Sequence, residues 1–152
     1  MEDLNPDWPE TGEDDESGVF FTSHDVEFEP AHPERLVEWI LETIESEGQE
    51  LTRLDIVFCS DAFLLEINQK HLGHDFYTDI ITFPLNENPL LAEIYISIDR
   101  VKENAQSLHI PFENELHRVM IHGVLHLCGY DDHEEEDIQI IRKKEDFYLG
   151  EL

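Results

Sequence analysis

Positive charge is scarce in this sequence: 9 Lys and Arg residues stand against 37 Asp and Glu residues, so the formal net charge is −28. Non-specific affinity for nucleic-acid phosphates needs Lys and Arg, and this composition therefore disfavours a broad basic interface. The acidic residues are spread along the chain, and a compact domain with this charge repels itself unless salt screens it. We expect a protein from the salt-rich cytoplasm of a halophile. The alternative is a mesophilic acidic protein with a basic partner.

Long apolar runs and cysteines are also few. No stretch of 18 apolar residues occurs, so we expect no transmembrane helix, and the acidic N-terminus lacks the basic start of a secretory signal. The two cysteines, Cys59 and Cys128, lie in apolar contexts on different predicted elements, which favours buried free thiols over a disulfide. Together these absences predict a cytoplasmic protein with no membrane partner.

The chain of 152 residues is long enough for one domain with one core. Residues 1–18 contain eight acidic residues, no basic residue and two prolines. Such a segment buries too little apolar surface to offset the entropy of ordering. We expect an acidic, disordered arm over residues 1–18 and a single folded domain over residues 19–152.

Hydrophobic periodicity divides the predicted domain into strands and helices. Alternating apolar residues predict four strands, over residues 19–28, 51–59, 79–85 and 91–98, the last two forming an antiparallel hairpin. Helical spacing predicts five helices, over residues 34–47, 61–71, 99–108, 112–128 and 134–149, the third of them capped by Asp99. The sequence therefore predicts an α+β fold with a small mixed sheet of about four strands packed by about five helices.

The predicted helix over residues 112–128 carries His122 and His126, one turn apart on the same face. The rest of the helix is apolar most of the way round, which predicts burial, and the two histidines continue a narrow polar stripe that begins with Glu115 and Arg118. Buried polar groups need partners, and a metal ion in an internal cleft would satisfy both imidazoles. Two helical imidazoles and a third ligand returned by a turn form an open, zincin-like zinc site.

The third ligand follows a turn at Gly129 and is either Asp132 or His133. The register His-x3-His-x2-Gly-x2-ligand selects Asp132, whereas the nitrogen ligand that catalytic zinc often uses favours His133. The residue of this pair that does not bind is expected to support the ligands or to act as a general base.

The position after the first histidine is Gly123, where zinc peptidases of the His-Glu-x-x-His kind carry a glutamate. This absence weakens a peptidase interpretation. The expected catalytic group is a water molecule on the metal held by His122 and His126, because zinc lowers the pKa of bound water to about 7. We therefore interpret residues 19–152 as one metal-hydrolase domain.

Four segments resemble the YbeY family of bacterial rRNA maturation factors. They are His-Gly-Val-Leu-His-Leu-Cys-Gly-Tyr-Asp at residues 122–131, Thr-Asp-Ile-Ile-Thr-Phe-Pro at 78–84, Ala-Glu-Ile-Tyr-Ile-Ser at 92–97, and Ile67-Asn68. The resemblance implies a single-domain α+β protein with a three-ligand site for one Zn²⁺ ion. It also implies a single-strand-specific, metal-dependent endoribonuclease that processes the 3′ end of 16S rRNA and takes part in ribosome quality control. The implied partners are rRNA and the small ribosomal subunit, and DNA is not expected.

The chain departs from this family pattern at two positions. Asp132 stands where the family has a third histidine, and Leu72 stands where the family has an arginine, a natural phosphate contact. Lys70, His71 and His74 are weaker donors nearby, which either substitute for the arginine or lie at a solvated helix end.

Three functions follow from these patterns. The first is the metal-dependent endoribonuclease, in which Asp79 orients the site, although Asp79 is equally suited to capping the start of its strand. The second is a non-catalytic ribosome-assembly factor with a structural metal, favoured by the net charge and by Leu72. The third, a small metallopeptidase, is the weakest because of Gly123.

Overall fold

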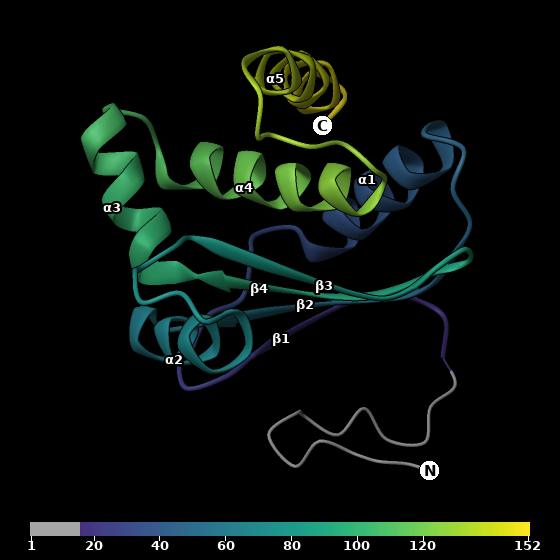
Figure 1. Ribbon diagram of the computed structural model, residues 1–152. Helices are drawn as coiled ribbons and strands as arrows, with labels where there is room; N and C mark the ends of the chain where they lie inside the picture. Colours follow the sequence, from purple (N-terminus) through teal and green to yellow (C-terminus); the bar gives the residue numbers. More distant parts are fainter. Residues whose placement is uncertain (1–15) are drawn as a thin grey trace, which may run out of the picture.

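The computed structural model describes residues 16–152, which form a four-stranded sheet and five helices (Figure 1). In chain order the elements are β1 (Gly18–Ser23), α1 (Pro33–Ser46), β2 (Leu51–Cys59), α2 (Asp61–Leu72), β3 (Ile80–Glu87), β4 (Leu90–Ser97), α3 (Ile98–Leu108), α4 (Phe112–Leu127) and α5 (Glu135–Gly150). The predicted α+β class is confirmed. The predicted arm over residues 1–18 falls outside the described residues except for its last three, and β1 already begins at Gly18.

The sheet is mixed, as predicted, with the strand order β1-β2-β4-β3. β2 is parallel to β1 and to β4, and β3 is antiparallel to β4. Ile56 of β2 is aligned with Phe21 on one side and with Ile94 on the other. The hairpin of β3 and β4 is confirmed, and it places the start of β3, where Asp79 lies, beside the end of β4.

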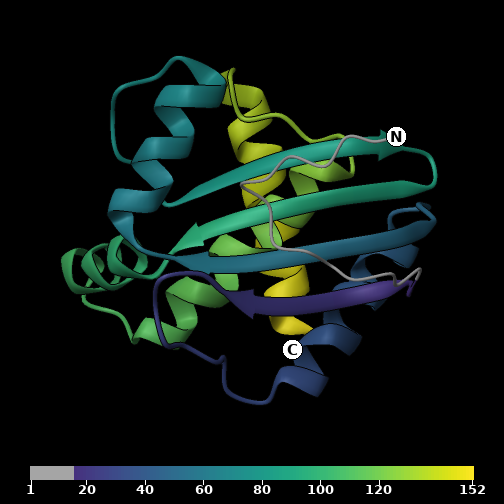
Figure 2. The ribbon, with the colours of Figure 1, turned by 90° about the horizontal axis from the view of Figure 1, so that it is seen from below.

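The helices cover the two faces of the sheet unequally. α1 and α4 pack on one face, α5 lies on the outer side of α4, and α2 lies on the opposite face (Figure 1). Figure 2, seen from the α2 side, shows that α2 covers only one end of the strands. The larger core joins Leu54, Ile56 and Phe58 of β2 to side chains of α4 such as Met120 and Val124. The histidine helix α4 therefore forms the layer between the sheet and α5.

β1 is shorter than the strand predicted over residues 19–28. It ends at Ser23, because the chain turns there: Asp25 adopts a positive φ of 58°, and the Ser23 hydroxyl donates to the backbone oxygen of Phe28 at 2.6 Å. The apolar residues of this turn pack against the core as a loop rather than as a strand.

The cap predicted for α3 is wrong. The hydroxyl of Ser97, not the carboxylate of Asp99, accepts from the backbone N–H of Arg100 at 3.0 Å, because β4 runs directly into the helix without a loop. Asp99 instead accepts from the backbone N–H of Asp61 at the start of α2, at 2.9 Å.

α4 is enclosed between the sheet and α5, as its apolar surface predicts. Met120, Val124 and Leu125 are fully buried. Arg118 joins α4 to α5 by donating to Glu145 and to Asp146, each at 2.8 Å.

The five helices of residues 16–152 include none with the length and hydropathy of a transmembrane helix.

Candidate metal centre

Three side chains converge at the end of α4. The rings of His122 and His126 lie one helical turn apart, with centroids 4.6 Å from each other. Oδ2 of Asp132 lies 3.4 Å from Nε2 of His122 and 3.4 Å from Nε2 of His126. Among residues 16–152 they form the one group of three or more His, Cys, Asp or Glu side chains whose donor atoms all lie within 4.8 Å of one another.

The turn after α4 brings the third side chain back over the helix. Gly129 has a φ of +110°, a conformation that residues with a Cβ rarely adopt. Its N–H donates to the oxygen of His126 at 3.0 Å, and the N–H of Tyr130 donates to the oxygen of Leu125 at 3.1 Å, so the last turn of the helix is closed. This local geometry aims Asp132 at the histidine pair.

The two candidate third ligands lie in different places. Asp132 faces the histidines, whereas His133 is exposed and lies outside the group of three. The path of the chain after Gly129 therefore turns Asp132, and not His133, toward the histidine pair.

The three donors fit a metal ion of the zinc type. Ligands about 2.1 Å from an ion and arranged as a tetrahedron lie about 3.4 Å apart, which is the spacing between Asp132 Oδ2 and each Nε2 atom. Two imidazoles and one carboxylate suit zinc and other first-row transition metals. Three protein ligands also leave a coordination position open, which is the arrangement of catalytic rather than structural zinc sites.

A fourth side chain, that of Glu145, contacts the ring nitrogen of His122 that faces away from Asp132. Oε2 of Glu145 lies 2.5 Å from Nδ1 of His122, and Oε1 of Glu145 accepts from Arg118. This contact makes Nδ1 the protonated nitrogen and turns the free electron pair of Nε2 toward Asp132. Glu145 is only 3% exposed. The sequence places it on the inward face of the last helix, but its contact with His122 joins α5 to α4 and becomes visible only in three dimensions.

The charges of this group shift the pKa values of both partners. Burial alone would lower the pKa of His122, but its hydrogen bond to Glu145 and the charges of Glu145, Asp132 and Asp79 outweigh burial and raise it. Burial alone would raise the pKa of Glu145, but His122 and Arg118 hold it below its usual value. Glu145 therefore remains a carboxylate, which is the form that accepts from Nδ1.

Loss of the Glu145 carboxylate is expected to weaken metal binding. In Glu145→Ala the ring of His122 is free to rotate, and we expect the Kd for Zn²⁺ to rise by about 10- to 100-fold, the usual effect of removing such a partner. Competition with a chromogenic chelator measures this Kd. Asp146→Ala is the matched control, because Asp146 binds the same arginine from the surface. Equal Zn²⁺ affinity in the wild type and in Glu145→Ala would show that Glu145 does not hold the ligand.

Asp79 lies at the start of β3, in the wall of the cavities that reach His122. Burial raises the pKa of the Asp79 carboxyl, while backbone N–H groups of Asp79 and Ile80 and the charges of His122 and Arg100 partly offset the rise. Its Oδ2 also accepts from Asn104 of α3 at 3.2 Å. Asp79 therefore has contacts at the start of the strand and also lines the cavities beside His122.

Gly123 faces the strands β3 and β4 from α4. A Cβ atom there would lie 2.6 Å from Cδ1 of Ile80 and 3.2 Å from Cδ1 of Ile94. The position that holds the glutamate of zinc peptidases therefore faces the sheet in this chain, and a longer side chain would collide with β3 and β4.

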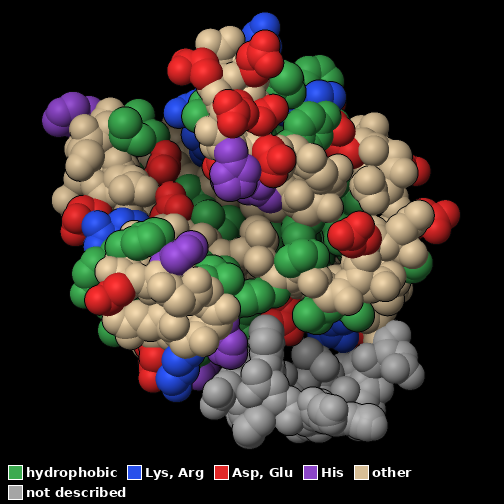
Figure 3. Space-filling model, in the orientation of Figure 1, with side chains coloured by type: hydrophobic (Ala, Val, Ile, Leu, Met, Phe, Trp, Pro, Cys, Tyr) green, Lys and Arg blue, Asp and Glu red, His purple; other side chains and the backbone are tan. Residues whose placement is uncertain are grey.

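Two cavities border the donor group: His122 and Asp132 line both, and His126 lines the smaller one. Figure 3 shows the molecule hollowed on this face, with histidine side chains on both sides of the hollow. The larger, of about 570 Å³, extends between α3 and α5 past Arg118, Ile138 and Arg142. The smaller, of about 350 Å³, extends past the loop that follows α2. His122, Asp132 and Asp79 line both cavities, so these side chains stand between the two spaces.

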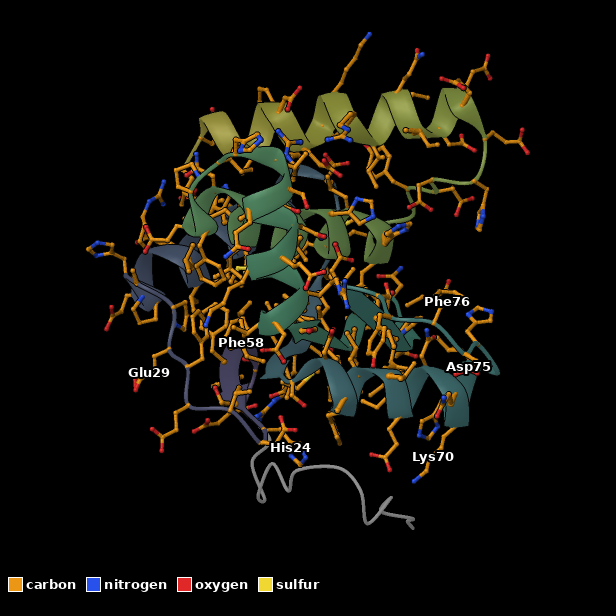
Figure 4. All side chains as sticks on the ribbon, turned by 90° about the vertical axis from the view of Figure 1, so that its left-hand side faces the viewer. His24, Glu29, Phe58, Lys70, Asp75 and Phe76 are labelled. Carbon is orange, nitrogen blue, oxygen red and sulfur yellow. The ribbon has the colours of Figure 1, made fainter. Side chains whose placement is uncertain are left out.

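The position of the family arginine is occupied by Leu72, which lines the smaller cavity and is 44% exposed. Of the suggested substitutes, Lys70 pairs with Glu66 of its own helix at 3.5 Å and points away from α4 (Figure 4). His71 packs against the ring of Phe83. Only His74 lines the cavity.

Comparisons with known proteins agree with the resemblance seen in the sequence. Residues 19–152 match the family model described as endoribonuclease YbeY. A protein of that name from Flavobacterium psychrophilum is 44% identical over 125 residues, covering 82% of this chain and 89% of the relative. Another from Amoebophilus asiaticus is 42% identical over 135 residues, covering 88% and 92%. The solution structure of a Thermotoga maritima protein matches with a TM-score of 0.61 and 32% identity, covering 88% of this chain and 90% of that one.

Proposed function

Because this chain belongs to the endoribonuclease YbeY family, we propose that it is a metal-dependent endoribonuclease that cleaves single-stranded RNA. The observation that carries this proposal is the convergence of His122, His126 and Asp132 beside two cavities, both of which are lined by His122 and Asp132. A cleavage centre with a cavity on each side leaves room for a long, flexible substrate. We further propose the 3′ end of 16S rRNA as its substrate, the small ribosomal subunit as its partner, and the salt-rich cytoplasm of a halophile as its compartment.

His122, His126 and Asp132 would hold the metal, proposed to be zinc, and His133 would remain free. When bound there, the ion supplies Lewis-acid polarisation of a phosphoryl oxygen and activation of water. Glu145 fixes the orientation of His122. The Asp79 carboxylate, with its raised pKa and its place in both cavities, would accept a proton from the attacking oxygen.

Arg142 is the side chain we propose for the phosphate contact that Leu72 cannot make. It projects from α5 into the larger cavity, beside His122. Arg118 lies nearby but is bound to Glu145 and Asp146. Arg142 forms no ion pair with any residue in the range 16–152, so its guanidinium is available for a phosphate.

Removal of this guanidinium is expected to weaken RNA binding. In Arg142→Ala we expect KM for a single-stranded oligonucleotide to rise about 10-fold, with the slope of log KM against log salt reduced by about one, since one phosphate contact is lost. Steady-state cleavage at several KCl concentrations measures both. Lys143→Ala removes a neighbouring positive charge outside the cavity and serves as the control. If both variants lose the same affinity, general charge rather than a specific contact is responsible.

Two other functions are weighed against this proposal. A non-catalytic ribosome-assembly factor with a structural metal is favoured by the net charge of −28. A site with only three protein donors, beside a cavity, would leave a bound ion one position for water or substrate, which argues for catalysis instead. A metallopeptidase is disfavoured because Gly123 faces the sheet.

The deciding experiment offers purified protein three substrates at molar KCl: 16S rRNA with an unprocessed 3′ end, the same sequence as a duplex, and an unstructured peptide. We expect metal-dependent cleavage of the single-stranded RNA alone. RNA left uncut, together with co-sedimentation with the small subunit that a chelator abolishes, would favour the assembly factor. Cleavage of the peptide would favour the peptidase.

A further inference from the structure

The loop between α2 and β3 presents two stacked rings beside the metal centre. The rings of His74 and Phe76 lie 5.1 Å apart between centroids, at an interplanar angle of 17°. Both line the smaller cavity together with His126 and Asp132. The lining of this cavity therefore includes both the metal donors and the two aromatic rings.

The two rings are held in place although they are on the surface. The side-chain amide of Asn68, which is 2% exposed, donates to the backbone oxygen of Phe76 at 2.8 Å. The backbone N–H of His74 donates to the oxygen of the same asparagine at 3.1 Å. Phe76 is nevertheless 56% exposed, and it lies on the side of α2 that faces α4 (Figure 4). The loop thus fixes a large apolar ring at the mouth of the cleft.

We propose that His74 and Phe76 form a stacking site for one unpaired nucleobase, next to the phosphate that is cleaved at the metal centre. This inference rests on the proposed function and specifies how the RNA is held. Every nucleobase has an aromatic face, so a ring pair of this kind binds RNA without reading its sequence.

The charge of the molecule favours a base over a phosphate as the ligand of this groove. None of the residues lining the smaller cavity is Lys or Arg, while two of them, Asp79 and Asp132, are acidic. Contacts with phosphates also weaken steeply as salt rises, whereas stacking is largely independent of salt. A chain with few cations can therefore retain RNA through its bases at high ionic strength.

The same site accounts for selection of single strands. A base in a duplex is paired and stacked within the helix, and its face is not available to a protein ring. Only an unpaired segment can place a base on Phe76 while its neighbouring phosphate reaches the histidines. Strand selectivity would then arise in the α2–β3 loop and not at the metal.

Substitution of Phe76 tests the proposal. We expect Phe76→Ala to raise KM for a single-stranded oligonucleotide about 10-fold, with kcat and the salt dependence of KM unchanged, and Phe76→Trp to restore the wild-type KM. Phe147→Ala is the matched control, because Phe147 is equally exposed, at 58%, but lies on α5 outside the smaller cavity. Thermal unfolding of each variant shows whether the fold is kept.

Oligonucleotides with one abasic residue complete the test. In the wild type, loss of the base at one position near the cleavage site is expected to raise KM, and in Phe76→Ala the same abasic change should have no further effect. If Phe76→Ala cleaves with the wild-type KM, and if no abasic position changes the KM of the wild type, the stacking site is overturned while the nuclease stands. A wild type that binds the oligonucleotide through Phe76 but does not cut it would overturn the nuclease and leave the stacking site standing.

Discussion

Replacement of His126 by alanine is expected to remove the metal and to lower RNA cleavage by about 1,000-fold or more. A catalytic metal contributes several kcal/mol of transition-state stabilisation, and each 1.4 kcal/mol is a factor of ten in rate. His126 is suited to this test because its Nε2 lies 3.4 Å from Asp132 and because Glu145 holds the other histidine, His122. Metal content by mass spectrometry and initial cleavage rates, both measured at molar KCl, give the two readouts.

The third ligand is resolved by a set of three variants. Asp132→Ala should behave like His126→Ala, whereas His133→Ala should keep both metal and activity, because His133 is exposed and lies outside the donor group. Asp132→His introduces the residue that the family pattern has at this position, and it should retain the metal. Loss of metal in His133→Ala, with retention in Asp132→Ala, would reverse the assignment. Metal bound equally by all the variants, His126→Ala included, would place the ion elsewhere.

The histidine pair was predictable because it depends only on local geometry. A spacing of four residues places His122 and His126 on one face of any α-helix, and the apolar residues around them predict burial. The turn at Gly129 was equally local, since glycine readily adopts the positive φ found there. The strand β2 has the predicted bounds, Leu51–Cys59, although its residues from Leu54 onward are buried on both faces rather than on alternate ones.

The remaining parts of the site depend on contacts between distant elements. The spacing of residues after the histidine pair cannot choose between Asp132 and His133, because a loop can absorb one residue. The path of the chain after Gly129 decides which of the two faces the histidines. Glu145 and Arg142 lie on α5, and their places at the site follow from how α5 packs across α4. Sequence periodicity gives the inward face of each helix, but it does not say which side chains of two helices meet.

Raising the KCl concentration from about 0.1 M to 3 M is expected to raise the Tm of the metal-loaded protein by about 10 °C or more. The screening length falls from about 10 Å to about 3 Å or less over this range, so most of the repulsion among the acidic side chains disappears. For a chain of this size a few kcal/mol of added stability corresponds to such a shift. Among the described acidic residues, only Asp55, Glu115 and Glu145 are buried, and the rest contribute to the surface charge.

A variant with less repulsion provides the control. Glu45, Glu50 and Glu87 are exposed and form no ion pair with any residue between 16 and 152. Changing all three to glutamine reduces the net negative charge from −28 to −25. The Tm at low salt should rise, because repulsion is reduced. The Tm at 3 M KCl should stay nearly unchanged, because the removed charges are already screened there. Differential scanning fluorimetry at fixed pH and fixed Zn²⁺ measures both values. A Tm that is the same in both salts and in both proteins would show that the acidic surface is not an adaptation to salt, and it would favour a basic partner for that surface.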